Sequence, residues 1–267
     1  MKLVVLAGFL GTAGDFEAWL TSLEAAFAEK KMPWFEDVKI IAVSEDPAFA
    51  PEGTWLDWTR STLEDLDKWA GTSRVFAIGY SLGGRLLLSL ADSKPDFFSK
   101  LVLMSAHPGL PDPAKKSLTL QESAMAAKER ATRRAQDEAW SRKFIERPWP
   151  NLMTEWQAQG VFKDSVQEPE RQERTYSRVV LAQLLTTFSL AAQPDYREAM
   201  RAWPVPQFWL AGERDAKFLA LLTGLADLKA DTIRCGIVPE ASHRIFLDNP
   251  RFTSRRVAEF FRSSSRD

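Results

Sequence analysis

Short, almost continuously apolar runs alternate along this chain with longer segments of helical spacing. The apolar runs cover residues 2–8, 38–43, 74–79, 100–106, 205–212 and 231–239. Helical spacing, with apolar residues every three or four positions, covers residues 15–31, 54–70, 82–92, 216–228 and 250–263. A strand that is apolar on both sides belongs to a sheet covered on both faces. The alternation therefore predicts an α/β fold, with a mostly parallel sheet between two layers of helices.

The alternation is interrupted in the middle of the chain. No apolar run typical of a strand occurs between residues 108 and 193, where 118–148 and 168–193 have helical spacing and are rich in Arg and Glu. An all-helical segment that interrupts an α/β core is typical of a lid lying over the sheet. We therefore expect three parts. These are a first part of the core (1–108), a helical lid (109–193) and a second part of the core (194–267).

The charge balance restricts the classes of partner. Lys and Arg number 35 against 36 Asp and Glu, a formal net charge of -1, which argues against a nucleic acid or an anionic membrane surface. No apolar stretch reaches the roughly 18 residues of a membrane-spanning helix. Residues 1–14 fit a buried strand and a glycine loop better than a signal peptide. Cys235 is the only cysteine, so an intrachain disulfide is impossible. We expect a cytoplasmic protein with a small-molecule ligand, and the sequence leaves any protein partner open.

The stretch AIGYSLGGRLLL places Ser81 between Gly79 and Gly83, after a predicted strand and before a predicted helix. At the apex of a sharp strand-to-helix turn the serine backbone is strained, and a Cβ at either glycine would clash with the neighbouring strand and helix. Such a turn places the hydroxyl at a helix N-terminus, where free N–H groups stabilise negative charge. We interpret Ser81 as a nucleophile. An ordinary glycine turn is the alternative, because this motif also occurs by chance.

A nucleophilic serine needs a base that is active near pH 7, and the chain has only two histidines. His243 lies between the last predicted strand and the last predicted helix, where it can reach Ser81, whereas His107 fits a turn or capping role. Asp215, just past a predicted strand, is the favoured acid to orient the histidine, with Glu213 as the alternative. The chain order serine, aspartate, histidine is that of α/β-hydrolases.

Two backbone N–H groups are expected to stabilise a developing oxyanion or enolate. One belongs to Leu82, directly after the nucleophile, and the other to Phe9, in the loop after the first strand. Each donor of this kind contributes on the order of 3 kcal/mol. Many α/β-hydrolases have His-Gly just before the second donor. This chain has Ala7 and Gly8 there, which removes no N–H group.

Several motifs together resemble the family of 2-succinyl-6-hydroxy-2,4-cyclohexadiene-1-carboxylate synthases, the MenH enzymes of menaquinone biosynthesis. They are GYSLGGR (79–85), HPGL (107–110), EAWSRKFIERP (138–148), EWQAQGVF (155–162), SLAAQPD (189–195) and AGERDAKF (211–218). The resemblance implies an α/β-hydrolase fold and a lyase whose Ser-His-Asp triad eliminates pyruvate from a polycarboxylate cyclohexene intermediate. It also implies that the enzyme uses no metal and no organic cofactor.

A substrate with several carboxylates requires fixed cations, and a guanidinium meets a carboxylate with two hydrogen bonds. The resemblance implies that the substrate-binding residues are Tyr80, Arg85, Arg133, Trp156 and Arg174, with Arg178 competing for the last position. Each of the better matched residues also has a structural alternative. Arg85 fits a structural ion pair, Arg133 fits a solvated charged helix face, and Trp156 fits packing of the lid on the core.

Two other functions remain open. A serine esterase or related acyl hydrolase would use the same triad through an acyl intermediate on Ser81. Its lid would more naturally be apolar than rich in arginine. A catalytically silent scaffold that binds a ligand or a partner is the third hypothesis. The complete set of Ser81, Asp215 and His243 argues against it.

Overall fold

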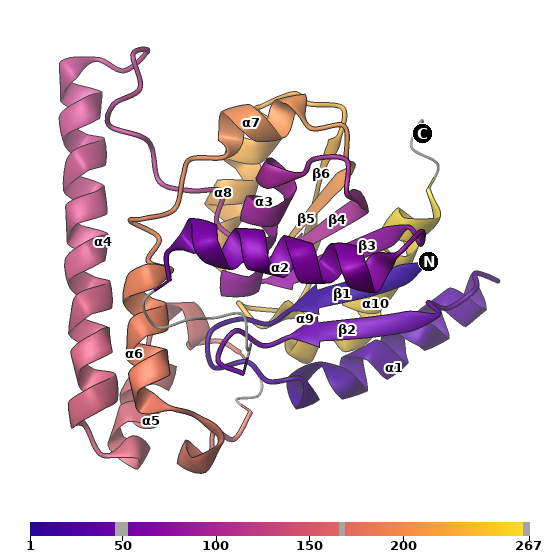
Figure 1. Cartoon of the computed structure of the whole chain (residues 1–267), viewed down its shortest axis with the longest axis horizontal. Helices are drawn as coiled ribbons and strands as arrows, with labels where there is room; N and C mark the ends of the chain where they lie inside the picture. The colour runs from indigo at the N-terminus through magenta and orange to yellow at the C-terminus, as the bar shows by residue number, and fades with distance from the viewer. Residues whose placement is uncertain (46–52, 166–168, 264–267) are drawn as a thin grey trace.

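The computed structural model describes residues 1–45, 53–165 and 169–263. Within these ranges a sheet of six strands runs in the order β2-β1-β3-β4-β5-β6, and every pair of neighbours is parallel (Figure 1). The strands are β1 (Lys2–Leu6), β2 (Asp37–Ile41), β3 (Val75–Tyr80), β4 (Phe98–Met104), β5 (Gln207–Gly212) and β6 (Ile233–Val238). The predicted parallel sheet is confirmed, and each strand end lies within two residues of its predicted position.

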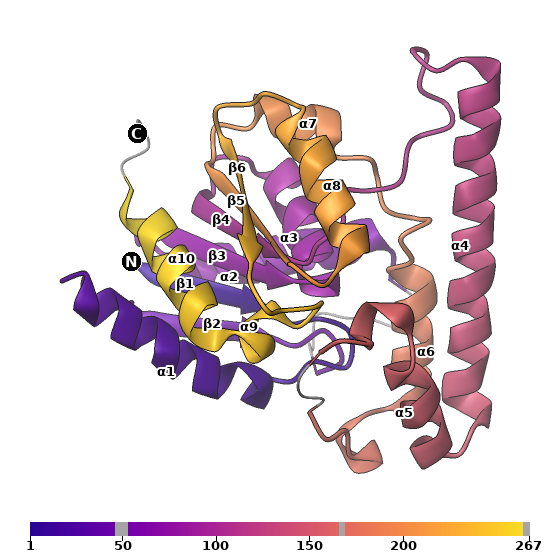
Figure 2. The same cartoon turned by 180° about the vertical axis from the view of Figure 1, so that it is seen from behind.

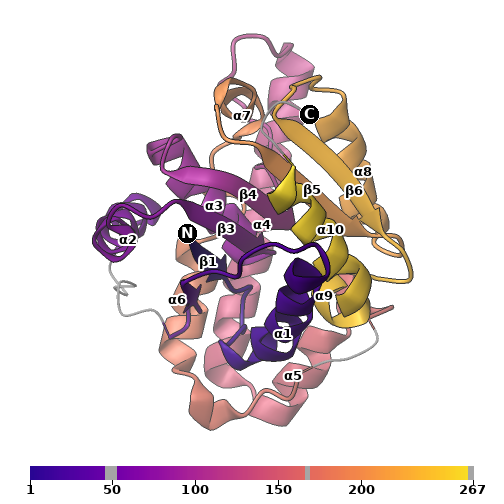
Figure 3. The same ribbon diagram turned by 90° about the vertical axis from the view of Figure 1, so that its right-hand side faces the viewer.

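Helices cover both faces of the sheet. On one face lie α2 (Trp55–Ala70), α3 (Leu82–Ser93) and α8 (Ala216–Ala226), and on the other lie α1 (Gly14–Glu29), α9 (Ile245–Asp248) and α10 (Pro250–Arg262). Figure 3 shows α2 and α3 across the sheet from α1 and α10, and Figure 2 shows α1 beside α10. Side chains such as Leu66 and Leu86 fill one layer, and Trp19 and Val257 fill the other. This two-sided burial explains why the strand sequences are apolar throughout.

Between β4 and β5 the described residues form helices and no strand. The helices are α4 (Leu120–Glu146), α5 (Trp149–Gln157), α6 (Arg178–Thr187) and α7 (Arg197–Ala202), with 3₁₀ turns at Gly160–Phe162 and Glu173–Thr175. A capping box between Thr119 and Glu122 starts α4. This helix has 27 residues and lies along α6, with α5 next to its C-terminal end. None of the described helices is long and apolar enough to cross a membrane.

The predicted helix over 168–193 is wrong over much of its length. In its described part only α6 is α-helical, and residues 169–177 form a loop with one 3₁₀ turn. The loop is held by long-range contacts rather than by a helical ladder. Arg171 pairs with Asp15 at 2.8 Å, and the hydroxyl of Tyr176 donates to the carbonyl of Leu10 at 2.8 Å. The predicted lid boundaries, at 108 and 193, stay a prediction.

The parallel strands end at one edge of the sheet, and the predicted site residues follow those ends. Phe9 comes after β1, Ser81 after β3, His107 after β4, Asp215 after β5 and His243 after β6. Because the carboxyl ends of parallel strands share an edge, the fold gathers these five residues on one side of the molecule.

Candidate active site

Ser81 has the strained backbone expected at a strand-to-helix turn. Its φ of 52° and ψ of -112° lie outside the regions that non-glycine residues favour. A Cβ on Gly79 would lie 2.5 Å from the Cα of Gly84, and a Cβ on Gly83 would lie 2.1 Å from the carbonyl oxygen of Leu6. The predicted need for glycine on both sides of Ser81 is therefore confirmed, and the close approach of strand and helix is its cause.

A line of hydrogen bonds joins Ser81, His243 and Asp215. The Ser81 Oγ lies 3.0 Å from Nε2 of His243, and Nδ1 of that ring lies 2.9 Å from Oδ2 of Asp215. The other carboxylate oxygen caps α8 by accepting from the N–H of Phe218 at 3.2 Å. With Nδ1–H donating to the carboxylate, a neutral ring presents Nε2 as an acceptor for the Ser81 hydroxyl. The arrangement can activate a serine oxygen as a nucleophile or as a base.

The two predicted oxyanion donors lie beside Ser81. Leu82 opens α3, so its N–H has no partner within the helix. Within the described ranges, neither this N–H nor that of Phe9 donates to a protein acceptor. Phe9 and Leu82 line the same cavity as Ser81. Their role as oxyanion donors stays a prediction.

The cavity at Ser81 has a volume of about 290 Å³ and combines aromatic walls with cationic side chains. An adjoining outer cavity of about 820 Å³ lies against α4. The residues common to both are His107, Arg133, Gln136, Leu190 and Lys217. Trp156 forms part of the inner wall, where its ring lies 4.9 Å from that of Phe9 and 5.0 Å from that of Trp140. Trp156 therefore faces the cavity and also packs the helical segment, the part of the chain between β4 and β5, on the core.

Arg85 faces the cavity and is only 9% exposed. Its Nε donates to Oε1 of Gln193 at 2.6 Å, one terminal N–H donates to the carbonyl of Phe188, and its guanidinium lies 5.4 Å from the centre of the Trp55 ring. In the described part of the chain no carboxylate pairs with it, so the alternative of a structural ion pair has no support there. Burial, with the nearby charge of Arg133, lowers the pKa of Arg85 to about 9, which leaves it cationic at neutral pH.

Two further cations lie where the cavities meet. Arg133 donates from Nε to Asp137 at 2.8 Å, and this buried carboxylate also accepts from Ser189 at 2.7 Å. Lys217 is exposed at this junction, although the surrounding protein, with Arg133 adding to the effect, lowers its pKa. Lys217 was not among the site residues predicted from the sequence. Its place in the motif AGERDAKF, two residues after Asp215, could have indicated that Lys217 lies near the site.

Tyr80 lies beside His243 rather than in the main cavity. Its ring is 5.6 Å from the ring of His243 and 5.0 Å from that of Phe246, and burial raises the pKa of its hydroxyl. A Cβ on Gly8 would come within 2.9 Å of the Tyr80 ring. Tyr80 lines a smaller cavity of about 60 Å³, which also borders Ser81.

Arg174 and Arg178 do not reach any of these three cavities, contrary to the prediction. Arg174 is exposed and donates to Gln172 at 2.9 Å, and Arg178 is bound to Glu173 at 2.6 Å. The 3₁₀ turn that carries Arg174 replaces the predicted helix, which changes the direction of its side chain. The arginine of this loop that lines a cavity with Ser81 is Arg171, in the smaller cavity.

The alternative base and acid take other roles. His107 accepts at Nδ1 from the N–H of Gly109 at 3.1 Å, in agreement with a turn role. Burial lowers the pKa of His107 to about 3, so its ring is neutral. Glu213 is exposed and accepts from the N–H of Glu240 at 2.9 Å. No group of three or more His, Cys, Asp or Glu side chains that could hold a metal ion occurs in the described ranges.

The comparisons with known proteins agree on the fold. Residues 4–256 match the pattern of the alpha/beta hydrolase family. A 2-succinyl-6-hydroxy-2,4-cyclohexadiene-1-carboxylate synthase of Escherichia coli O1:K1 is 33% identical over 190 residues, which are 69% of this chain and 67% of that protein. The structure of MenH from S. aureus aligns with a TM-score of 0.79 at 20% identity, over 98% of this chain and 93% of that one. An esterase from Exiguobacterium antarcticum aligns with a TM-score of 0.64 at 15% identity, over 98% and 92%.

Proposed function

We propose a function from the premise that this chain belongs to the alpha/beta hydrolase family and, within it, to the 2-succinyl-6-hydroxy-2,4-cyclohexadiene-1-carboxylate synthases. The proposed reaction is the elimination of pyruvate from 2-succinyl-5-enolpyruvyl-6-hydroxy-3-cyclohexene-1-carboxylate. The catalytic groups are Ser81, His243 and Asp215, and no metal or organic cofactor takes part. The Escherichia coli relative carries the name of this activity.

The observation that carries the proposal is the charge of the cavity. Arg85, Arg133 and Lys217 line it or its junction with the outer cavity, and only Arg133 is paired with a carboxylate of the described chain. Uncompensated cations in a partly enclosed cavity favour a ligand with several carboxylates. A neutral ester would leave these charges without a partner.

In the proposed mechanism Ser81 acts as a base toward carbon. His243 takes the hydroxyl proton at Nε2, and the Ser81 oxygen removes the proton from ring carbon 2, next to the succinyl ketone. The resulting imidazolium is stabilised by Asp215, which lies 2.9 Å from Nδ1. The electron pair moves onto the ketone oxygen, where the N–H groups of Phe9 and Leu82 stabilise the enolate.

The second step expels the side chain. The enolate collapses, the ring double bond shifts, and the bond between ring carbon 5 and the enolpyruvyl oxygen breaks, which leaves a 2,4-diene. The departing enolate takes up one proton, supplied by the His243 imidazolium through Ser81, and becomes pyruvate. Protons and electrons balance without an oxidant, a reductant or water.

The test is pyruvate release from this substrate by wild type and by Ser81→Ala. We expect the variant to lose at least about a thousand-fold in kcat, because the base is removed. The control is Ser254→Ala, which removes a buried hydroxyl that has no hydrogen-bond partner in the described chain and lies on α10, outside the three cavities. The proposal is wrong if wild type releases no pyruvate above the uncatalysed rate, or if Ser81→Ala matches the control.

Ester hydrolysis is the second candidate function. The esterase from Exiguobacterium antarcticum shares the fold, and a serine hydrogen-bonded to a histidine can also attack an acyl carbon. This function predicts efficient turnover of a neutral ester such as p-nitrophenyl butyrate, with an acyl group on Ser81. A kcat/KM for that ester above the value for the polycarboxylate would favour hydrolysis.

A further inference from the structure

Gln193 is completely buried and bonded at both ends of its carboxamide. Its Oε1 accepts from Nε of Arg85 at 2.6 Å, and its Nε2 donates to the carbonyl of His107 at 2.9 Å. The guanidinium can only donate and the carbonyl can only accept, so the two partners define the orientation of the amide. A neutral carboxamide accepts from one partner and donates to the other, whereas an ionised carboxylate of the same length could only accept.

The same glutamine lies where the helical segment joins the core. Residues 107–111 lead from β4 toward α4, and residues 189–195 lead from α6 toward α7. The two connections lie side by side, since the N–H of Tyr196 donates to the carbonyl of Pro108 at 2.9 Å. A Cβ on Gly109, whose φ is 117°, would lie 2.1 Å from the carbonyl oxygen of Pro194. The contact is therefore too close for any other residue.

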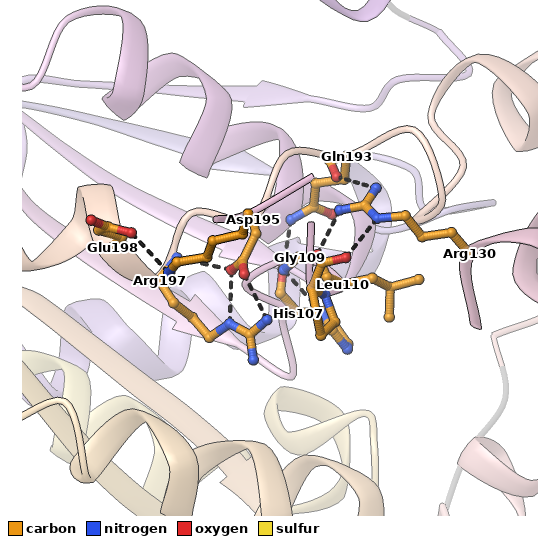
Figure 4. Close-up of polar contacts among 10 residues, drawn as sticks. His107, Gly109, Leu110, Arg130, Gln193, Asp195, Arg197 and Glu198 are labelled. Atoms are coloured by element: carbon orange, nitrogen blue, oxygen red, sulfur yellow. Dashed lines mark hydrogen bonds and ion pairs between the residues drawn. The ribbon is translucent and has the colours of Figure 1, made fainter. Parts of the chain in front are cut away.

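Arg130, on α4, fastens both connections. Its guanidinium donates to the carbonyls of Leu110 at 2.5 Å and Pro111 at 2.8 Å in the first connection. It also donates to those of Ala191 at 2.8 Å and Gln193 at 3.1 Å in the second. Figure 4 shows Arg130 and His107 on either side of Gln193. The backbone of Gln193 is thus held by the helical segment, while its side chain holds Arg85.

We propose that Gln193 is a positioning residue for anion recognition, which orients the Arg85 guanidinium in the cavity without neutralising it. This inference rests on the proposed function, in which Arg85 binds a substrate carboxylate. A glutamate carboxylate at this position would still accept from Arg85, but it would cancel the charge of the guanidinium and could not donate to the carbonyl of His107. An apolar side chain would keep the charge, but it would leave the Nε–H of Arg85 without its acceptor and the guanidinium less firmly oriented.

The direct test observes the Arg85 Nε–H by nuclear magnetic resonance of protein labelled with ¹⁵N-arginine. Its signal is identified by its absence in Arg85→Lys. We expect slow exchange with water in wild type and in Gln193→Glu, and exchange at least about tenfold faster in Gln193→Leu, because the buried acceptor is lost. The proposal is overturned if Gln193→Leu keeps the slow exchange.

The control is Gln207→Leu, since Gln207 is also completely buried. The side chain of Gln207, the first residue of β5, donates to the carbonyl of Met200 at 3.1 Å and accepts from Trp209 at 3.3 Å. Gln207→Leu therefore removes as many side-chain hydrogen bonds as Gln193→Leu does. We expect no change in the Arg85 signal in this variant. A change equal to that in Gln193→Leu would mean that general loosening, and not positioning, controls the exchange.

Kinetics with the proposed substrate separate position from charge. In Gln193→Leu we expect KM to rise about tenfold with kcat within about threefold, because a mobile guanidinium must be ordered on binding. In Gln193→Glu we expect a KM rise at least as large, although Arg85 stays ordered. An unchanged KM in Gln193→Glu overturns the proposal. If wild type releases no pyruvate, the proposed function fails, and the resonance measurement still decides whether Gln193 positions Arg85.

Discussion

Replacing Gly83 by alanine tests the close approach on which the serine turn depends. The new Cβ would lie 2.1 Å from the carbonyl oxygen of Leu6 and 2.5 Å from that of Ala7. Van der Waals contact requires about 3.4 Å, so α3 and β1 would have to separate by about 1.3 Å. Leu6 cannot move freely, because it pairs with Ile41 of β2 and Gly79 of β3.

Overpacking of a core costs about 1–3 kcal/mol, and a collision with two backbone carbonyls belongs at the upper end of that range. We therefore expect Gly83→Ala to lower the free energy of unfolding by about 3 kcal/mol. It should also lower kcat, because β1 leads directly into the loop with Phe9, the proposed oxyanion donor. Helix propensity alone predicts that Gly83→Ala raises the free energy of unfolding, since alanine stabilises a helix by about 1 kcal/mol over glycine.

Gly224 supplies the matched control. It lies in α8, and a Cβ there would meet nothing within 4 Å. Gly224→Ala should raise the free energy of unfolding by about 0.5–1 kcal/mol. Urea unfolding followed by tryptophan fluorescence measures both variants, provided that the slope of the transition is unchanged. A Gly83→Ala variant as stable as wild type would refute the reasoning about the turn.

Three further predictions concern charge and protonation. Asp215→Asn should lower kcat by about 10⁴ in the pyruvate assay, while urea unfolding shows little change, because asparagine also caps a helix; a normal kcat would remove Asp215 from the mechanism. Arg85→Met should lower kcat/KM by roughly 10- to 100-fold for the polycarboxylate and leave p-nitrophenyl butyrate unaffected; equal losses for both would argue against an anion site. His107, whose pKa is lowered to about 3 in the folded protein, gives a pH dependence. As the pH falls, His107 takes up a proton in the unfolded state before it does so in the folded state. The contribution of His107 to stability is therefore complete above about pH 6.5 and falls as the pH drops toward 3. Between pH 7.5 and 5.5 the loss from this residue is about 1.4 kcal/mol, and His107→Asn should remove it; an unchanged pH profile of unfolding in the variant would show that His107 is not buried as a neutral ring.

The strands were predictable because both faces of the sheet are covered, which leaves a continuous apolar signal in each strand. The same reasoning explains where Ser81, Asp215 and His243 come together, since each follows a parallel strand and all such ends share one edge. Their catalytic roles stay predictions. The glycines beside Ser81 were predictable because the close approach of strand and helix is local in sequence.

The helical segment was less predictable because its contacts are long-range. Residues 169–177 resemble a helix in composition, yet Arg171 and Tyr176 bind the loop after β1 instead. No local pattern reveals such a contact. For the same reason the family resemblance implied Arg174 or Arg178, and nothing in the sequence indicated Arg171. The sequence also did not single out Gln193, which bonds to a residue more than a hundred positions away.

The mass of the ring product tests the central claim most directly. Elimination through Ser81 requires a cyclohexadiene that equals the substrate minus pyruvic acid. Hydrolysis of the enol ether would also release pyruvate but would leave a ring alcohol that is heavier by one water. We predict that wild type forms the diene and pyruvate in equal amounts and that Ser81→Ala forms both at least about a thousand-fold more slowly. A ring alcohol as the main product would contradict the account.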